Sequence, residues 1–233
     1  MYTLKLIVIS DIHANYDALE AVSKEICDCD HLVCLGDLVG YGAQPNEVIE
    51  EIRRIKPQTI IAGNHDYATV TGDTSNFVTY ASKVIEWTRR RMKSENLAFL
   101  SSLPHYSTKT IDDTVIACYH GSPRDPLNEY IYPGAPQFVL QALIEEATAN
   151  LLFLGHTHMP LYSSTPSGTL INPGSIGQPR DGDPRSSYST IEISEGKIIC
   201  RTERISYDIE SAASKIVQEG LPAFLSDRLF VGV

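Results

Sequence analysis

The sequence contains no hydrophobic run long enough to cross a bilayer, which takes roughly 20 apolar residues. Its first apolar stretch, LKLIVIS, is also too short for the core of a signal peptide and is followed directly by Asp11. We therefore expect a cytoplasmic protein that has no membrane partner.

Cysteine is scarce and odd in number, with five residues that mostly lie inside apolar stretches. That pattern predicts buried free thiols in a reducing compartment and argues against a disulfide framework. Cys27 and Cys29 have no second cysteine pair at zinc-site spacing, so we interpret them as packing residues at a helix end. The cysteines are Cys27, Cys29, Cys34, Cys118 and Cys200.

Positive charge is in short supply, since 19 lysines and arginines stand against 29 aspartates and glutamates and give a net charge of −10. This balance argues against a nucleic-acid or anionic-membrane surface as the main partner. The one basic run, TRRRMK at residues 88–93, follows apolar residues at helical spacing and is typical of the end of an amphipathic helix. A small substrate is the expected partner, and the oligomeric state stays open.

Apolar residues are plentiful enough for a sizeable core, at 42 % of 233 residues, and this size favours one domain over residues 1–233. In the first half, apolar strand patterns alternate with helical patterns, which predicts parallel strands; the second half is richer in strands. We predict a layered α/β fold with two sheets. The segment from about residue 197, a strand followed by a helix near 209–217, is interpreted as a C-terminal packing segment.

Polar residues end the successive strand patterns, in the segments SDIH, LGD, GNHD, YHG and GHTH. The carboxyl ends of strands are where α/β sheets bind ligands, so these endings are expected to face one pocket. The last segment has two histidines one residue apart, and extended backbone would point both rings to the same side. Converging neutral imidazoles favour a metal. The histidines in these endings are His13, His65, His120, His156 and His158.

The motifs DIH, GDLVG, GNHD, HG and GHTH follow one another over residues 11–158, and NPGS at 172–175 extends the series. This ordered set resembles the motif series of the calcineurin-like metallophosphoesterases. It looks most like the compact bacterial and archaeal members, a group that includes small phosphodiesterases, phosphatases and diadenosine polyphosphate hydrolases. The resemblance implies an α/β fold, a β-sandwich of two mixed sheets flanked by helices, and a dinuclear metal centre.

By this resemblance, Asp37 would bridge two divalent metals. A mixed nitrogen and oxygen shell suits transition metals, with Mn expected first and Fe, Zn, Co or Ni as alternatives. Two such metals, roughly 3.5 to 4 Å apart, can activate a water and stabilise the attacking and leaving oxygens at phosphorus. The first metal would be held by Asp11, His13, Asp37 and His158, and the second by Asp37, Asn64, His120 and His156.

His65 follows the expected ligand Asn64 and, by the same resemblance, is the general acid that protonates the leaving oxygen. Asp66 comes next in the chain and has two interpretations. It either orients the imidazole ring of His65 or serves as an acidic residue at a helix N-terminus.

One departure from the family bears on the substrate. Where the serine/threonine phosphatase branch has Asp-Arg after its Gly-Asp motif, this chain has Gly40 and Tyr41, so that branch's phosphate-binding arginine is missing. This favours a small phosphomonoester, phosphodiester or dinucleoside polyphosphate as substrate over a phosphoprotein. The arginines that could clamp a phosphate are Arg124, Arg180 and Arg185, each with a surface salt bridge as the alternative.

Two other classes of function are weighed against this one. A non-catalytic scaffold is the first, because retromer's metallophosphoesterase-like subunit resembles this fold and serves in assembly. Here every expected ligand position and His65 are filled, which favours catalysis. An amidohydrolase-type enzyme is the second, but it would have His-x-His on its first strand, where this chain has Asp11 and His13.

Overall fold

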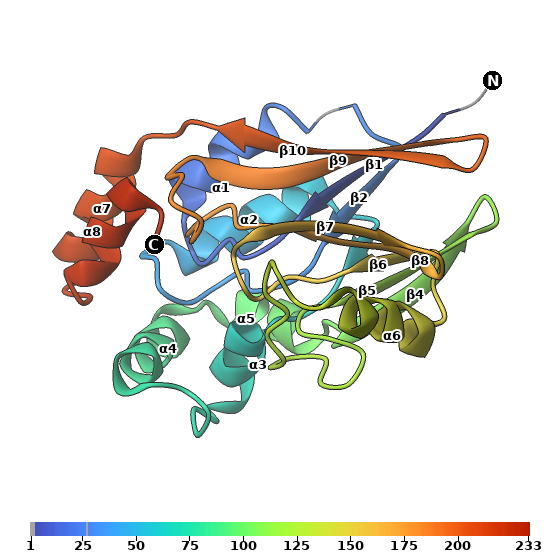
Figure 1. Ribbon diagram of the computed structural model, residues 1–233. Helices are drawn as coiled ribbons and strands as arrows, with labels where there is room; N and C mark the ends of the chain where they lie inside the picture. The colour runs from blue at the N-terminus through green and yellow to red at the C-terminus, as the bar shows by residue number, and fades with distance from the viewer. Residues whose placement is uncertain (1–2, 27) are drawn as a thin grey trace.

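A computed structural model of the protein describes residues 3–26 and 28–233. Its strands form two five-stranded mixed sheets, which confirms the predicted fold class (Figure 1). The first sheet has the order β10-β9-β1-β2-β3, in which β1, β2 and β3 run parallel and β9 and β10 are antiparallel additions. Its strands are β1 (Leu4–Ile9), β2 (His31–Cys34), β3 (Thr59–Ile60), β9 (Ser186–Ser194) and β10 (Lys197–Ile205).

The second sheet has the order β4-β5-β6-β8-β7. Its three central strands run parallel, and an antiparallel strand pairs with each outer side of them. The parallel strands of both sheets therefore bring their carboxyl ends to common edges. The strands are β4 (Tyr106–Ile111), β5 (Thr114–Tyr119), β6 (Leu151–Phe153), β7 (Pro160–Thr165) and β8 (Gly168–Pro173).

The apolar faces of the two sheets pack against each other in the core of the sandwich. Leu6 and Val8 of β1 lie in one buried cluster with Phe153 of β6, which is fully buried. Ile7 and Ile9 alternate with them along β1 and join a different cluster, under the helices on the outer face. Because side chains alternate along a strand, β1 is buried on both faces, which explains its continuous apolar sequence.

Helices cover the outer faces of the sandwich. Two helices pack on the first sheet, and one packs on the second through Leu140, Leu143 and Ile144. A further group lies below the sheets at the end where the parallel strands finish (Figure 1). The helices are α1 (Tyr16–Ser23), α2 (Pro45–Ile55), α3 (Asn64–Thr71), α4 (Thr79–Arg91), α5 (Ser94–Ser101) and α6 (Gln137–Ala147).

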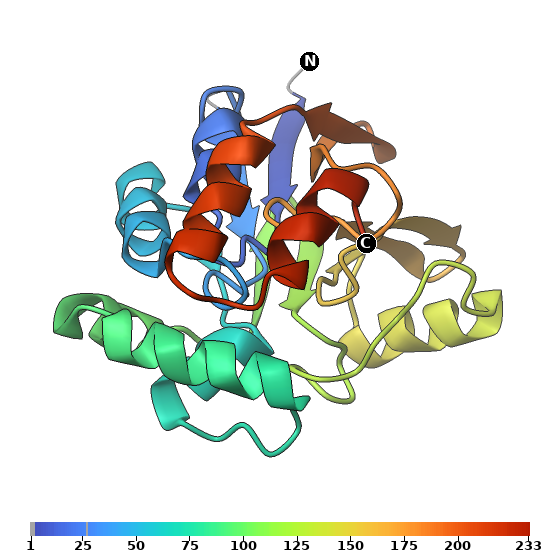
Figure 2. The same ribbon diagram turned by 90° about the vertical axis from the view of Figure 1, so that its left-hand side faces the viewer.

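The C-terminal helices α7 (Ile209–Gln218) and α8 (Phe224–Val231) stand in front of this same end of the sheets (Figure 2). They pack on α4 and on the loop after β2 through an apolar cluster that includes Tyr41, Leu225 and Leu229. An ion pair between Lys215 and Asp17, 2.7 Å apart, ties α7 to α1. The tail is thus fixed beside the carboxyl ends of the strands.

Several predicted elements differ from the observed ones. The third predicted strand forms pairs at two residues only, because the chain leaves the sheet for α3. Helix α8 and the edge strands β4 and β7 were not predicted. For β4 the reason is that the strand is largely exposed and has no alternation of apolar residues. Of the cysteines, Cys27 lies outside the described residues, and Cys34, Cys118 and Cys200 are free thiols. No helix among the described residues is long and apolar enough to cross a membrane.

Candidate metal centre

All seven expected metal ligands lie just beyond strands of the two sheets, at the end that α7 and α8 cover (Figures 1 and 2). Each is at most 8 % exposed. The parallel strands deliver them because their carboxyl ends share one edge. Asp11 and His13 follow β1, Asp37 follows β2, Asn64 opens α3 beyond β3, His120 follows β5, and His156 and His158 follow β6.

Asp11, His13 and His158 form the first group of donor atoms. The Nδ1 atoms of the two imidazoles lie 3.2 Å and 2.6 Å from the backbone oxygens of Val39 and Gln178, which can only accept a hydrogen bond. With the proton on Nδ1, each Nε2 presents a lone pair, and these two atoms are 3.0 Å apart. Burial also lowers the pKa of His158 well below its ordinary value. Two facing lone pairs repel, so this arrangement suits a cation between them.

Asp37, His120 and His156 form the second group. His120 donates from Nδ1 to the backbone oxygen of Leu35 at 2.8 Å, and its Nε2 lies 3.2 Å from Oδ2 of Asp37. Although burial opposes it, this carboxylate raises the pKa of His120 to about 9, so a metal would have to displace a proton there. Burial lowers the pKa of His156 to about 4, which keeps that ring in the neutral form that binds metals.

Five of the expected ligands have a buried polar atom without a hydrogen bond among the described residues, although two of these atoms, Nε2 of His120 and Oδ2 of Asp37, form an ion pair with each other. Leaving such an atom unsatisfied costs about 1 to 3 kcal/mol each. Bound cations would satisfy them all, and a mixed set of carboxylate, amide and imidazole donors fits transition metals. The atoms are Oδ1 of Asp11, Oδ2 of Asp37, Oδ1 of Asn64, Nε2 of His120 and Nε2 of His156.

The ligand loops have unusual backbone. Five ligands have a positive φ, a region that costs a non-glycine residue free energy and is concentrated at functional sites. This corrects the expectation of extended backbone at the last two histidines: their rings do not share one strand face, and each joins a different donor group. The angles are 54° at Asp11, 50° at His13, 50° at Asp37, 68° at His156 and 60° at His158.

Close backbone packing between motifs also fixes the position of the Asp37 carboxylate. Its Oδ1 accepts a hydrogen bond from the backbone N–H of His65 at 2.8 Å. A Cβ at Gly63 would lie 2.1 Å from that same oxygen, so only glycine fits there. The other oxygen of Asp37, Oδ2, lies 3.2 Å from Nε2 of His120 and 3.5 Å from Nε2 of His13.

His65 lies beside the donor atoms, and its ring packs edge-on to His13 with centroids 4.9 Å apart. It is also packed by Tyr41 and Phe77. Its Nδ1 is buried without a hydrogen-bond partner, and burial lowers the pKa of the ring to about 3. The free protein therefore holds His65 neutral. To give up a proton as an acid it must first gain one, which the charge of a bound phosphate would favour.

Asp66 makes its hydrogen bonds to the backbone around the start of α3, as its second interpretation expects. Both of its oxygens are used by backbone N–H groups, of Leu38 and Val39 on one side and of Gly63 on the other, at 2.9 to 3.2 Å. Burial, together with the charge of Asp37, raises its pKa to about 7. The residue fixes the start of α3 against the loop that follows β2.

The three candidate arginines have different surroundings. Arg124 forms a two-pronged ion pair with Glu146, at 2.7 and 2.8 Å, and Arg185 forms one with Asp183. These are the surface salt bridges given above as the alternative. Arg180 instead lies over the ring of Tyr41, with its guanidinium carbon 5.6 Å from the ring centroid. Only Arg180 of the three contacts a residue that packs on the donor cluster.

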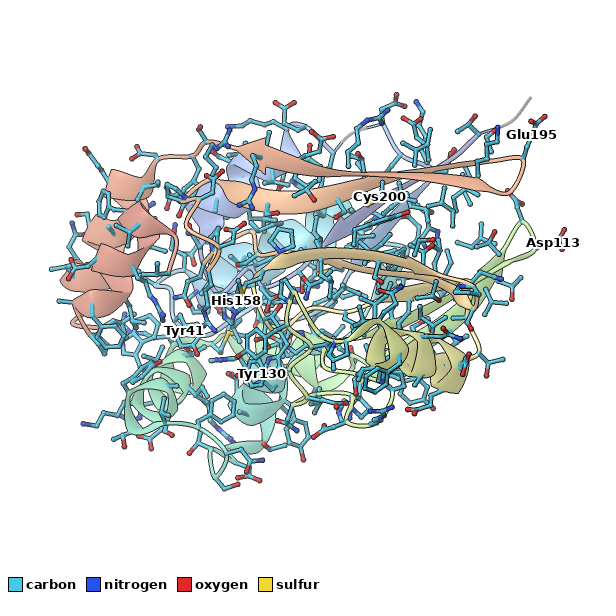
Figure 3. All side chains as sticks on the ribbon, in the orientation of Figure 1. Tyr41, Asp113, Tyr130, His158, Glu195 and Cys200 are labelled. Carbon is cyan, nitrogen blue, oxygen red and sulfur yellow. The ribbon has the colours of Figure 1, made fainter. Side chains whose placement is uncertain are left out.

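Sequence reasoning missed several supporting residues. Tyr130 stacks on His156 with centroids 3.8 Å apart, and Tyr41 packs on His13 at 4.7 Å. Figure 3 shows Tyr41, His158 and Tyr130 gathered at one end of the sheets. Asn172, in the NPGS motif, donates to the backbone oxygen of Gly155 at 2.6 Å and so holds the last ligand loop. That motif was the one sequence signal for such a supporting role.

Comparison with known proteins agrees with this geometry. The model of the calcineurin-like phosphoesterase superfamily domain matches residues 4–196, most of the chain. The protein belongs to this family. Membership implies metal-dependent phosphoester hydrolysis and divalent metal ions, for which the chain has the candidate ligands described above.

Similar proteins extend over the whole chain. The uncharacterized protein MJ0912 of Methanocaldococcus jannaschii is 37 % identical, over 97 % of each chain. The crystal structure of a metallophosphoesterase from Sphaerobacter thermophilus is 34 % identical, with a TM-score of 0.84 and 99 % of each chain covered. The hypothetical protein PH1004 of Pyrococcus horikoshii OT3 shares the fold, with a TM-score of 0.89 at 23 % identity and the same coverage.

Proposed function

We propose that this calcineurin-like phosphoesterase uses two metals to hydrolyse small phosphoesters or phosphoanhydrides. One observation carries the proposal: Oδ2 of Asp37 belongs to the group with His120 and His156 and also lies 3.5 Å from Nε2 of His13 in the other buried group. A carboxylate whose second oxygen faces both groups is suited to bridging two cations. The diadenosine polyphosphate hydrolases to which the motifs are similar remain one candidate activity among these.

The metals, when bound, would activate a water and offset the charge that develops at phosphorus. The residues of the chain have complementary tasks. His13 and His158 keep their Nε2 lone pairs turned inward because backbone oxygens hold Nδ1. His65, whose ring packs against that of His13, is proposed to donate the proton to the leaving oxygen. The neighbouring rings of Tyr41 and Phe77 limit the access of water to that proton.

A small substrate is favoured over a phosphoprotein by what stands in place of the phosphatase arginine. Tyr41 has a φ of 59° and turns its ring onto His13 and His65. Phosphate binding is then left to Arg180, which lies over Tyr41. Arg180 is half-buried, so a bulky protein substrate has less access to it than a small one.

A non-catalytic scaffold is the second candidate function, but the buried donor atoms argue against it. An assembly surface does not need five buried polar atoms that form no hydrogen bond within the described residues. Residence in a reducing compartment such as the cytoplasm is also proposed, on the free thiols of Cys34 and Cys118, both of which are buried.

The test is a substrate panel with metal analysis. The protein is stripped with a chelator, loaded with Mn²⁺ and desalted, and elemental analysis should give two metals per chain. A nitrophenyl phosphomonoester, a nitrophenyl phosphodiester, a dinucleoside polyphosphate and a phosphopeptide are then compared. We expect metal-dependent hydrolysis of a small substrate and little of the phosphopeptide. Two bound metals without turnover of any substrate would favour the scaffold, and fewer than one metal per chain would contradict the proposed centre.

A further inference from the structure

Helix α8 brings a second arginine to the edge of the candidate metal centre. Arg228 donates from Nη1 to Oε1 of Gln178 at 3.4 Å, and Arg180 donates from Nη2 to the same oxygen at 2.9 Å. Gln178 is 2 % exposed. Two guanidinium groups thus converge on one buried, neutral amide, although Arg228 lies beyond the residues that the family model matches.

In the described part of the chain, no acidic side chain pairs with either arginine. Among the described residues, no Asp or Glu oxygen lies within 4.0 Å of either guanidinium, and the neighbouring Asp181 and Asp183 pair with Arg204 and Arg185. Nε of Arg180 is buried without a hydrogen-bond partner among the described residues. Nε of Arg228 donates at 2.6 Å to an oxygen of Val233, the last residue of the sequence, where a terminal carboxylate would offset part of the Arg228 charge. Burial, and then the nearby Arg180, lower the pKa of Arg228. Arg180 is thus the member of the pair whose charge has no carboxylate beside it among the described residues.

A single residue, Gln178, lies between the arginine pair and the donor cluster. The backbone oxygen of Gln178, whose side chain receives both arginines, accepts the hydrogen bond from Nδ1 of His158 at 2.6 Å. Arg180 lies over Tyr41, and the ring of Tyr41 is 4.5 Å from that of His65. Figure 3 shows Tyr41 and His158 close together at this end of the sheets. An anion on the arginines would thus lie beside the phosphate that reacts.

We propose that Arg180 and Arg228 form an anion subsite that binds a second phosphate group of the substrate. This rests on the proposed function, because it places the reacting phosphate at the donor cluster and its neighbour at the arginines. Guanidinium groups bind phosphate through paired, charge-assisted hydrogen bonds, and a phosphate would supply the negative charge that Arg180 has no acidic side chain to provide. This subsite would select substrates that contain at least two phosphate groups, such as nucleoside diphosphates and dinucleoside polyphosphates.

Binding can be tested without turnover. Methylphosphonate and methylenediphosphonate are stable to hydrolysis and differ in having one or two phosphoryl groups. Their affinities are measured by calorimetry on the protein as purified and after Mn²⁺ loading and desalting. We expect the unchanged chain to prefer the diphosphonate, and Arg228→Ala to reduce that preference by about tenfold or more, the usual effect of losing hydrogen bonds to a charged group.

Arg201→Ala is the matched control. It removes the same charge from an exposed arginine of β10 whose partner is Glu192 on the neighbouring strand, and it should leave the preference unchanged. Should Arg228→Ala fail to fold, Arg228→Gln makes the same test, since it keeps a side chain able to hydrogen-bond to Gln178 but removes the charge. The apolar contacts of Leu225 and Leu229 keep α8 docked in either variant, which thermal melting checks.

Kinetics separate this subsite from a merely structural role of α8. Arg228→Ala should raise KM for a nucleoside diphosphate or dinucleoside polyphosphate and leave KM for a nitrophenyl phosphodiester unchanged. If the variant instead undocked α8, the rate of hydrolysis of both substrates would fall. An unchanged diphosphonate preference in Arg228→Ala, or an equal loss in Arg201→Ala, overturns the proposal. Arginine-dependent binding without any turnover would support the subsite and refute the proposed function, whereas turnover without that binding would do the reverse.

Discussion

Asp37 uses its two carboxylate oxygens for different purposes. One accepts the backbone N–H of His65, and the other faces histidines of both donor groups. We therefore expect Asp37→Asn to abolish activity and to weaken both metals together, because an amide has a single oxygen and no charge to share. Elemental analysis after Mn²⁺ loading measures this. Loss of one metal with full retention of the other would contradict a bridging role.

His65 packs against the expected ligand His13, and its Nδ1 has no hydrogen-bond partner among the described residues. His65→Ala is expected to keep both metals and to lower kcat by about 10² to 10⁴, the usual contribution of a positioned acid or base. An ester with a nitrophenyl leaving group should lose less than one with a poor leaving group, because it needs less help from a proton. Equal losses for both esters, or a loss of metal, would show that His65 is not the acid.

At the scale of an element, α3 and the loop after β2 are held together by one side chain. Asp66 accepts hydrogen bonds from the backbone N–H groups of Gly63, Leu38 and Val39. Asp66→Ala should lower the free energy of unfolding by about 2 kcal/mol or more, since a helix cap and two further hydrogen bonds are lost. Urea unfolding measures this, and Asp66→Asn, which keeps an acceptor, is the milder control.

The same variant distinguishes the two interpretations of Asp66. If Asp66 only fixes the backbone, metal-loaded Asp66→Ala should slow esters with good and poor leaving groups by similar factors. A loss confined to poor leaving groups, as expected for His65→Ala, would instead show that Asp66 acts through the ring of His65. The ratio of kcat for the good leaving group to kcat for the poor one is measured for Asp66→Ala and for His65→Ala, and comparing these two ratios decides between the roles.

For the whole molecule, the candidate centre joins the two sheets, because its ligands follow strands of both. Metal that binds only the folded state adds about 2.7 kcal/mol of stability when its free concentration is 100 times Kd. Removing metal with a chelator should therefore lower Tm, and Mn²⁺ should restore it. Asp37→Asn should show little of this shift. An unchanged Tm in protein that elemental analysis shows to be loaded, and then stripped, would contradict it.

The sequence predicted the parts of the site that follow strands. Each expected ligand motif comes directly after an apolar run, so the strand pattern also located the motif. The structure gathers six of the seven residues in two donor groups, and the seventh, Asn64, precedes His65, whose backbone N–H binds Asp37. That they bind metal, and that the chain is one domain with a packing tail, stay predictions.

The tail itself shows what the sequence could not reveal. Arg228 is 48 positions from Arg180 (228 − 180) and lies in no motif. Only the docking of α8 through Leu225 and Leu229 places the two arginines on the same amide. Local patterns predict helices and strands, but they do not predict which distant helix covers a site.

The left-handed backbone at the ligands implies a trade between stability and function that protein engineering can measure. Glycine ordinarily destabilises a chain relative to alanine, but at a φ of 60° the order should reverse, since a Cβ costs about 1 to 2 kcal/mol there. In metal-free protein, His158→Gly is thus expected to be more stable than His158→Ala by about 1 kcal/mol, although both lose the imidazole. A search for thermostable variants would then favour glycine at ligand positions, and would improve the fold by removing the chemistry.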